Sequence, residues 1–80
     1  MVDPNETFLD VKGLNCPMPL LKAKRTLNGM EAGERLRVVA TDPGSMKDFT
    51  VFAKQAGHDL LEAYEDQGTF NYLLVKHPRA

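Results

Sequence analysis

The sequence predicts a two-layer α/β sandwich, in which two helices cover one face of a four-stranded mixed sheet. Two segments alternate between apolar and polar residues, which is typical of half-buried strands, and two further strand segments flank a hairpin turn. Two segments with apolar residues at helical spacing lie between the first three of these strands. The order is therefore β-α-β-α-β-β, and right-handed crossovers place both helices on the same side of one sheet. With 80 residues, the chain is expected to form a single domain over residues 1–80.

The first strand is predicted over residues 7–11, and the first helix follows over residues 17–30. Gly13 permits the turn between them. The core stripe of this helix is formed by Leu20, Ala23, Leu27 and Met30. Polar residues 1–6 and residues 77–80 are predicted to be disordered tails.

The second strand is predicted over residues 35–41, with Arg35 and Arg37 on the face opposite the core. Its core side is formed by Leu36, Val38 and Ala40. Asp42 is expected to cap the second helix, with Ser45 as the alternative cap, and Gly57 to end it. The core stripe of this helix is formed by Phe49, Phe52, Ala53 and Ala56.

Two further strands are predicted over residues 58–65 and 70–76, joined as a hairpin by the turn Asp66-Gln67-Gly68. Both alternating sets of the last strand are mostly apolar. The sequence therefore does not decide which face of that strand is buried.

Cys16 is the single cysteine, and it stands where a strand pattern gives way to a helix pattern. Pro17 and Pro19 would break a helix interior but fit a first turn, so Cys16 is expected at the N-cap or one residue before it. The helix N-terminus predicts a lowered pKa for this thiol. Because both helices are expected to begin at one sheet edge, Asp42 should lie beside Cys16.

The side of the first helix opposite its core stripe carries an apolar and then basic strip. The strip is formed by Met18, Leu21, Lys22 and Arg25. It is a candidate docking face for partner proteins, which Arg35 and Arg37 could extend. A merely solvated helix face is the alternative interpretation.

Composition narrows the classes of function. The formal net charge of −1 gives no whole-protein reason to expect nucleic-acid or membrane binding. A single cysteine cannot form an internal disulfide, which fits the reducing cytoplasm, and the N-terminal residues do not resemble a signal peptide. His58 and His77 are not spaced with Cys16 as a metal-ligand set, and no cofactor motif is present, so neither a metal nor a cofactor is expected.

The segment Gly13-Leu14-Asn15-Cys16-Pro17-Met18-Pro19 resembles the Cys-Pro-x-Pro signature of the TusA (SirA-like) sulfur-carrier family. The likeness covers about residues 7–76 and includes Asp42-Pro43 and Lys47-Asp48-Phe49. The resemblance implies a cytoplasmic, sulfurtransferase-type carrier without conventional small-molecule turnover. Such a carrier accepts sulfane sulfur as a persulfide on Cys16. Residues supporting the motif would be Gly13, Pro17, Pro19 and Asp42.

The resemblance also implies a cysteine desulfurase or rhodanese-type donor and a downstream acceptor protein. Branches of the family serve tRNA thiolation, molybdenum-cofactor synthesis or sulfur oxidation. Members that act in tRNA thiolation carry an acidic residue between the two prolines, where this chain has Met18. The acceptor pathway therefore stays open, and we expect the carrier to work as a monomer.

Two other functions remain possible from the sequence. One is an RNA- or protein-binding module of the same fold, using the basic residues Lys22, Arg25, Arg35 and Arg37. The sequence lacks the motif of stacking aromatic residues that is typical of such RNA-binding modules. The other is a redox sensor in which Cys16 is oxidised or glutathionylated.

Overall fold

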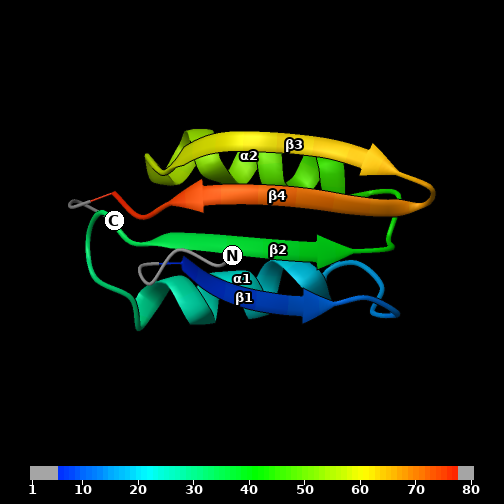
Figure 1. The fold of residues 1–80 in the computed structure, drawn as a ribbon, viewed down its shortest axis with the longest axis horizontal. Helices are drawn as coiled ribbons and strands as arrows, with labels where there is room; N and C mark the ends of the chain where they lie inside the picture. Colours follow the sequence, from blue (N-terminus) through cyan, green and yellow to red (C-terminus); the bar gives the residue numbers. More distant parts are fainter. Residues whose placement is uncertain (1–5, 78–80) are drawn as a thin grey trace.

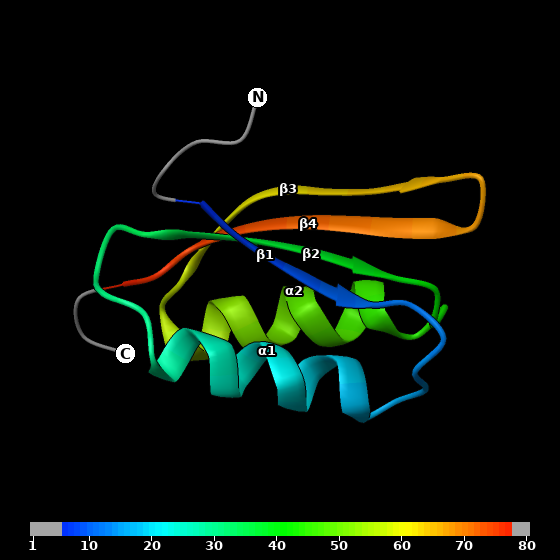
Figure 2. The same ribbon diagram turned by 60° about the horizontal axis from the view of Figure 1, so that its bottom comes forward.

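A computed structural model describes residues 6–77. In chain order, as Figure 1 shows, the elements are β1 (Glu6–Val11), α1 (Met18–Asn28), β2 (Arg35–Ala40), α2 (Ser45–Ala56), β3 (Asp59–Asp66) and β4 (Thr69–Val75). The sheet order is β1-β2-β4-β3, with β1 parallel to β2 and β4 antiparallel to both of its neighbours. Both helices cover the same face (Figure 2), which confirms the predicted two-layer α/β fold.

The core lies between the sheet and the two helices. Leu36, Val38 and Ala40 point into it, as predicted. Phe49 of α2 stacks on Tyr72 of β4 with ring centroids 4.5 Å apart. Such a pair is worth roughly 0.5–1.5 kcal/mol beyond the area it buries.

The structure also decides which face of β4 is buried. Phe70, Tyr72 and Leu74 lie on the face covered by the helices. On the other face Leu73 is also buried, between its register partners Arg37 and Glu62. Asn71 and Val75 on that other face are only half-buried, so the face toward the helices is the core face of this strand.

The limits of α1 differ slightly from the prediction. The helix begins at Met18, with Pro17 at the N-cap, and ends at Asn28. Met30 therefore lies beyond the helix, where its N–H donates to the carbonyl of Leu27. Leu20 and Met30 are half-buried against the core, and Pro19 is buried instead.

The predicted capping of α2 by Asp42 is wrong. The helix begins at Ser45 with Gly44 at the N-cap, and no side chain caps it. The carbonyl of Asp42 accepts the N–H of Ser45 at 3.0 Å, so Asp42 belongs to a turn that precedes the helix. Gly57 ends α2 as expected, with a left-handed φ of 80° and its N–H donating to Ala53.

The hairpin between β3 and β4 is confirmed, although each strand begins one residue away from its predicted start. Its two connecting residues, Gln67 and Gly68, both have positive φ (51° and 83°). This combination is typical of a type I′ turn, whose twist matches that of the flanking strands.

Most of the two predicted tails lies outside the described residues. Glu6, however, begins β1 and pairs with Arg35. His77 is also held, because its backbone N–H donates to Nδ1 of His58 at 3.0 Å. Among residues 6–77, no helix is long and apolar enough to cross a membrane.

Candidate active site

The candidate site lies at the edge of the sheet where β1 and β2 end and both helices begin (Figure 1). Gly13 has a positive φ of 84°, and its N–H donates to Thr41 Oγ1 at 2.9 Å. This bond ties the segment after β1 to the segment after β2. The segment that carries Cys16 is thereby held beside the start of α2.

Cys16 is exposed and immediately precedes the N-cap of α1, as predicted. Its Sγ lies 3.3 Å from Oδ2 of Asp48, a distance and geometry in which the thiol donates to the carboxylate. The Cys16 sulfur and one carboxylate oxygen from each of Asp42 and Asp48 all lie within 4.8 Å of one another. The predicted neighbourhood of Cys16 and Asp42 is therefore confirmed, and Asp48 joins them.

The predicted lowering of the Cys16 pKa is wrong. The hydrogen bond to Asp48 raises this pKa, and the negative charges of Asp48 and Asp42 raise it further. A carboxylate beside a thiol disfavours the thiolate because the two negative charges repel each other.

The start of α1 cannot offset this repulsion in the way the sequence suggested. Pro17 and Pro19 have no N–H to offer. The N–H of Met18 already donates to the carbonyl of Asn15 at 2.9 Å. Three of the first four amide positions at this helix start are thus removed or occupied, so few donors remain to stabilise a thiolate.

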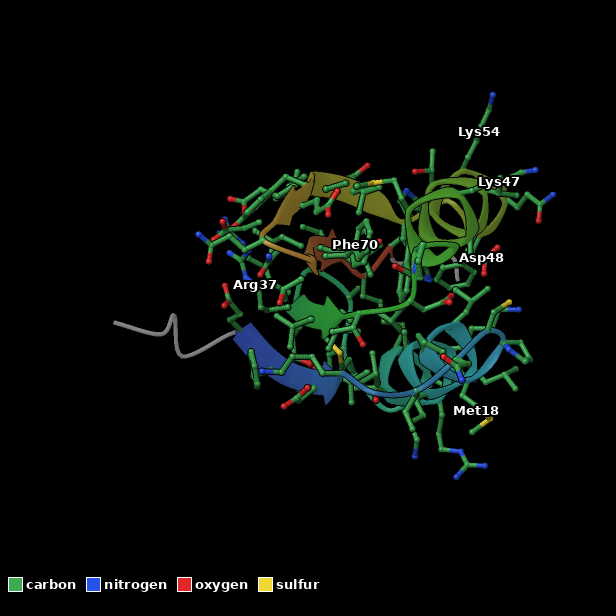
Figure 3. All side chains as sticks on the ribbon, turned by 90° about the vertical axis from the view of Figure 1, so that its right-hand side faces the viewer. Met18, Arg37, Lys47, Asp48, Lys54 and Phe70 are labelled. Atoms are coloured by element: carbon green, nitrogen blue, oxygen red, sulfur yellow. The ribbon has the colours of Figure 1, made fainter. Side chains whose placement is uncertain are left out.

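Asp48 is placed by the anchoring of α2. Ser45 and Phe49, on either side of it in the first turns, are fully buried. The Ser45 hydroxyl forms a hydrogen bond of 2.5 Å with the Tyr72 hydroxyl, and the Asp48 N–H donates to Gly44 at 3.2 Å. Figure 3 shows Asp48 on the side of α2 that faces α1.

The Asp42 carboxylate has a different environment. Its Oδ2 atom is buried without a hydrogen-bond partner among residues 6–77. One thiol and two carboxylates are a mixed donor set, and the proton of Cys16 would have to leave before its sulfur bound a metal. We therefore describe the group as a thiol beside two carboxylates.

The predicted docking strip forms one surface on α1. Met18, Leu21, Lys22 and Arg25 line a shallow hollow of about 130 Å³. Met18 and Leu21 are 42% and 49% exposed, which is high for large apolar side chains. Figure 3 shows Met18 on the side of α1 away from α2.

Arg35 and Arg37 do not extend this strip. Both come from β2 on the sheet face opposite the helices, and Figure 3 shows Arg37 on that face. Arg37 is also engaged there, with NH1 donating to Glu62 at 2.7 Å and Nε lying 3.6 Å from Glu6. The basic residues proposed for RNA binding therefore lie on two separate surfaces.

A groove between α1 and α2 was not predicted. It has a volume of about 240 Å³ and is lined by Leu20, Lys24, Lys47, Asp48, Val51, Phe52 and Gln55. The Lys24 ammonium lies 5.5 Å from the Phe52 ring centroid, within cation–π range. Patterns read one helix at a time do not reveal a surface that two helices share. Nothing in the local sequence around Lys47-Asp48-Phe49 indicates that Asp48 contacts Cys16.

His58 has a structural position. It is buried, its Nδ1 accepts the N–H of His77, and its ring lies 5.5 Å from the Phe52 ring. Burial lowers the pKa of His58, and the positive charge of Lys76 lowers it further. His58 is thus not brought to the thiol as a catalytic partner.

The fold and this site define a small α/β protein that presents one thiol at a helix start. A family model described as sulfurtransferase TusA matches residues 7–76. The chain belongs to the TusA family of sulfur carriers, which confirms the resemblance seen in the sequence.

Individual relatives agree with this assignment. The chain is 57% identical over 68 residues to the sulfur carrier protein TusA of Allochromatium vinosum, covering 85% of this chain and 90% of that protein. It is 49% identical over 73 residues to a putative sulfur carrier protein of Neisseria meningitidis, covering 91% and 97%. The crystal structure of a SirA-like protein from Desulfitobacterium hafniense superposes with a TM-score of 0.75 at 26% identity, covering 89% of this chain and 99% of that one.

Proposed function

We propose that this carrier holds sulfur as a persulfide on Cys16. The observation that supports this most strongly is that the single thiol of the chain is exposed at the start of α1. A sulfur carrier needs one nucleophilic sulfur that can reach into the sites of other proteins. A second nearby cysteine would discharge the cargo as a disulfide, so a lone cysteine suits the role.

The transfer is an exchange at sulfur. The Cys16 sulfur attacks the outer sulfur of a donor persulfide, the donor S–S bond breaks, and the donor leaves as a thiol. The same exchange in reverse passes the outer sulfur from Cys16 to an acceptor. Gly13, Pro17 and Pro19 support this site by fixing the turn that presents the thiol, and Asp42 places a carboxylate beside the sulfur.

Partner recognition belongs to the strip of Met18, Leu21, Lys22 and Arg25. The strip starts two residues after Cys16, so a protein that docks on it also reaches the sulfur. Its apolar start and basic end fit a partner surface with an apolar patch and acidic neighbours.

The donor in this proposal is a cysteine desulfurase or a rhodanese-type protein, and the acceptor is a second protein that receives sulfane sulfur. The setting is the cytoplasm, where a lone thiol stays reduced. The carrier works as a monomer. The acceptor pathway is not assigned, because Met18 takes the place of an acidic residue between the prolines.

The other two functions find less support. RNA binding would draw on basic residues that lie on separate surfaces, and Arg37 is already paired with two glutamates. A redox sensor would use the same exposed thiol, but the matching family model and the relatives named as sulfur carriers favour the carrier role.

The test is incubation with a cysteine desulfurase and cysteine, followed by intact-mass measurement. We expect the chain to gain the mass of one sulfur atom, and a reductant to remove it. Cys16→Ser is the matched control, because it keeps the size and exposure of the side chain. An equal gain on Cys16→Ser, or no gain with either class of donor, would contradict the proposal.

A further inference from the structure

We propose that Asp48 is a second catalytic residue, whose carboxylate holds the thiol proton of the unloaded carrier and passes it on during sulfur transfer. This inference rests on the proposed persulfide chemistry of Cys16 and adds the group that moves the proton. It stands on the 3.3 Å contact between Cys16 Sγ and Asp48 Oδ2, which joins the start of α1 to the first turn of α2.

The carboxylate is held in place by the packing around it. Ser45 and Phe49 flank Asp48 on α2, and both are fully buried against Tyr72. Asp48 itself is half-buried, at one end of the groove between the helices. Its position near the α2 N-terminus also suits a negative charge. The contact with the thiol therefore joins a rigid element to the exposed end of the cysteine segment.

Charged groups from three segments lie at this contact or along the groove that Asp48 also lines. Asp42 comes from the segment between β2 and α2, Lys24 from α1 and Lys47 from α2. The two carboxylates raise the pKa of the Cys16 thiol, while the two lysines line the groove beside Asp48. Because the start of α1 offers few free amides, the unloaded sulfur stays protonated, and that proton must be moved before sulfur can be exchanged.

Asp48 gives the transfer a balanced path for the proton. The Sγ–H proton passes to Asp48 Oδ2 as Sγ bonds to the outer sulfur of the donor persulfide. The donor S–S bond breaks, and its electron pair stays on the inner donor sulfur. That sulfur takes the proton from Asp48 and leaves as a thiol, so no oxidant or reductant is consumed.

Loading also ends the contact. The Cys16 sulfur then carries a second sulfur in place of hydrogen and has no proton to donate. The outer sulfur lies one S–S bond, about 2.05 Å, beyond Sγ. The hydrogen bond to Asp48 therefore belongs to the unloaded carrier alone.

The experiment compares two rates in the wild type and in Asp48→Asn, which keeps the side-chain size but removes the charge. The first rate is alkylation of Cys16 by iodoacetamide as a function of pH. The second is loading from glutathione persulfide, followed by intact mass. Asp59→Asn is the control, because it removes the same charge from an exposed position outside the site.

For Asp48→Asn we expect the alkylation midpoint to move to lower pH. At neutral pH alkylation should be faster, by roughly threefold for each pH unit of that shift. Loading should instead become slower, on the order of threefold or more, because an amide cannot take up the proton. Asp48→Glu should restore both rates in part, and Asp59→Asn should match the wild type. A merely structural role would not drive the two rates in opposite directions.

An Asp48→Asn midpoint that is unchanged or higher overturns the proposal. So does a loading rate that is unchanged or rises together with alkylation. If the wild type itself does not load, the proposed function fails. If the wild type loads and Asp48→Asn behaves like it, only the role of Asp48 fails.

Discussion

The two helices begin side by side at the same edge of the sheet, yet the first residue of α1 is exposed and the first residue of α2 is buried. α1 starts next to an exposed thiol, and its first helical residue, Met18, is 42% exposed. α2 starts with Ser45, which is 1% exposed and hydrogen-bonded to Tyr72. One start thus presents an exposed thiol, while the other anchors the residue that contacts it.

The difference explains how so small a domain holds the surroundings of an exposed thiol in place. An exposed sulfur gains little positional definition from packing. The buried start of α2 fixes the position of Asp48, which lies between Ser45 and Phe49, and Asp48 in turn contacts the sulfur. The carrier therefore keeps its thiol accessible to partners without leaving its surroundings undefined.

The largest loss of stability should come from disrupting the buried start of α2. Phe49→Ala removes a fully buried ring that stacks on Tyr72, and should lower the free energy of unfolding by about 3–5 kcal/mol. Leu21→Ala on the exposed side of α1 should change it by less than about 0.5 kcal/mol. Urea unfolding followed by circular dichroism measures both. Equal losses would show that the two helix starts contribute equally to stability, which would contradict the comparison.

A smaller loss is expected at the buried hydroxyl pair. Ser45→Ala leaves the Tyr72 hydroxyl without its partner and should cost about 1–3 kcal/mol. Adding Tyr72→Phe removes the orphaned hydroxyl, so the double variant should recover part of that loss. Urea unfolding of the two single variants and the double variant closes the cycle. A double variant whose loss equals the sum of the single losses would mean that the hydroxyl pair contributes nothing.

Changing the exposed start should affect transfer and leave stability alone. Reversing charge with Lys22→Glu and Arg25→Glu should weaken the apparent affinity for a cysteine desulfurase on the order of 3- to 10-fold, roughly 1 kcal/mol. The loading rate against desulfurase concentration gives this number. Reversal of Lys54 and Arg35 together is the control, because both are exposed outside the strip and the net charge changes by the same amount. If both changes weaken loading alike, the effect is one of net charge and not of the strip.

The smallest effect lies away from both helix starts, at His58. Burial lowers its folded-state pKa below the ordinary 6.5, so the unfolded chain takes up the proton first as pH falls. The stability that depends on neutral His58 is therefore full above about pH 6.5 and is lost as pH falls through the folded-state pKa. His58→Gln should flatten this part of the pH–stability curve. Thermal melts of both proteins between about pH 5 and pH 8 provide the measurement, and two parallel curves would contradict it.

Most of the fold could be predicted because its signals are local. Alternation in residues 35–40 and helical spacing around Phe49 are visible in the sequence. The position of Cys16 before the first helix could be predicted equally well, since proline limits where a helix can begin. The capping of α2 was missed because the Asp42 carbonyl, not its side chain, is used in the turn.

The electrostatics of the site could not be predicted in the same way. The pKa of Cys16 depends on Asp48, which is 32 positions further along the chain and meets the thiol only after α2 has packed. The positive end of a helix dipole favours a thiolate when only the local sequence is considered. In the folded protein this effect is outweighed by the prolines in the first turn of α1, which remove amide donors, and by the Asp48 carboxylate from α2.

The most direct test of the carrier role is whether sulfur on Cys16 can be given up again. Carrier loaded by a desulfurase, freed from donor and free cysteine, would be treated with cyanide, which takes sulfane sulfur as thiocyanate. The account predicts one thiocyanate for each loaded chain, return of the protein to its unloaded mass, and none from Cys16→Ser. Sulfur that stays on the protein, or thiocyanate released equally by Cys16→Ser, would contradict it.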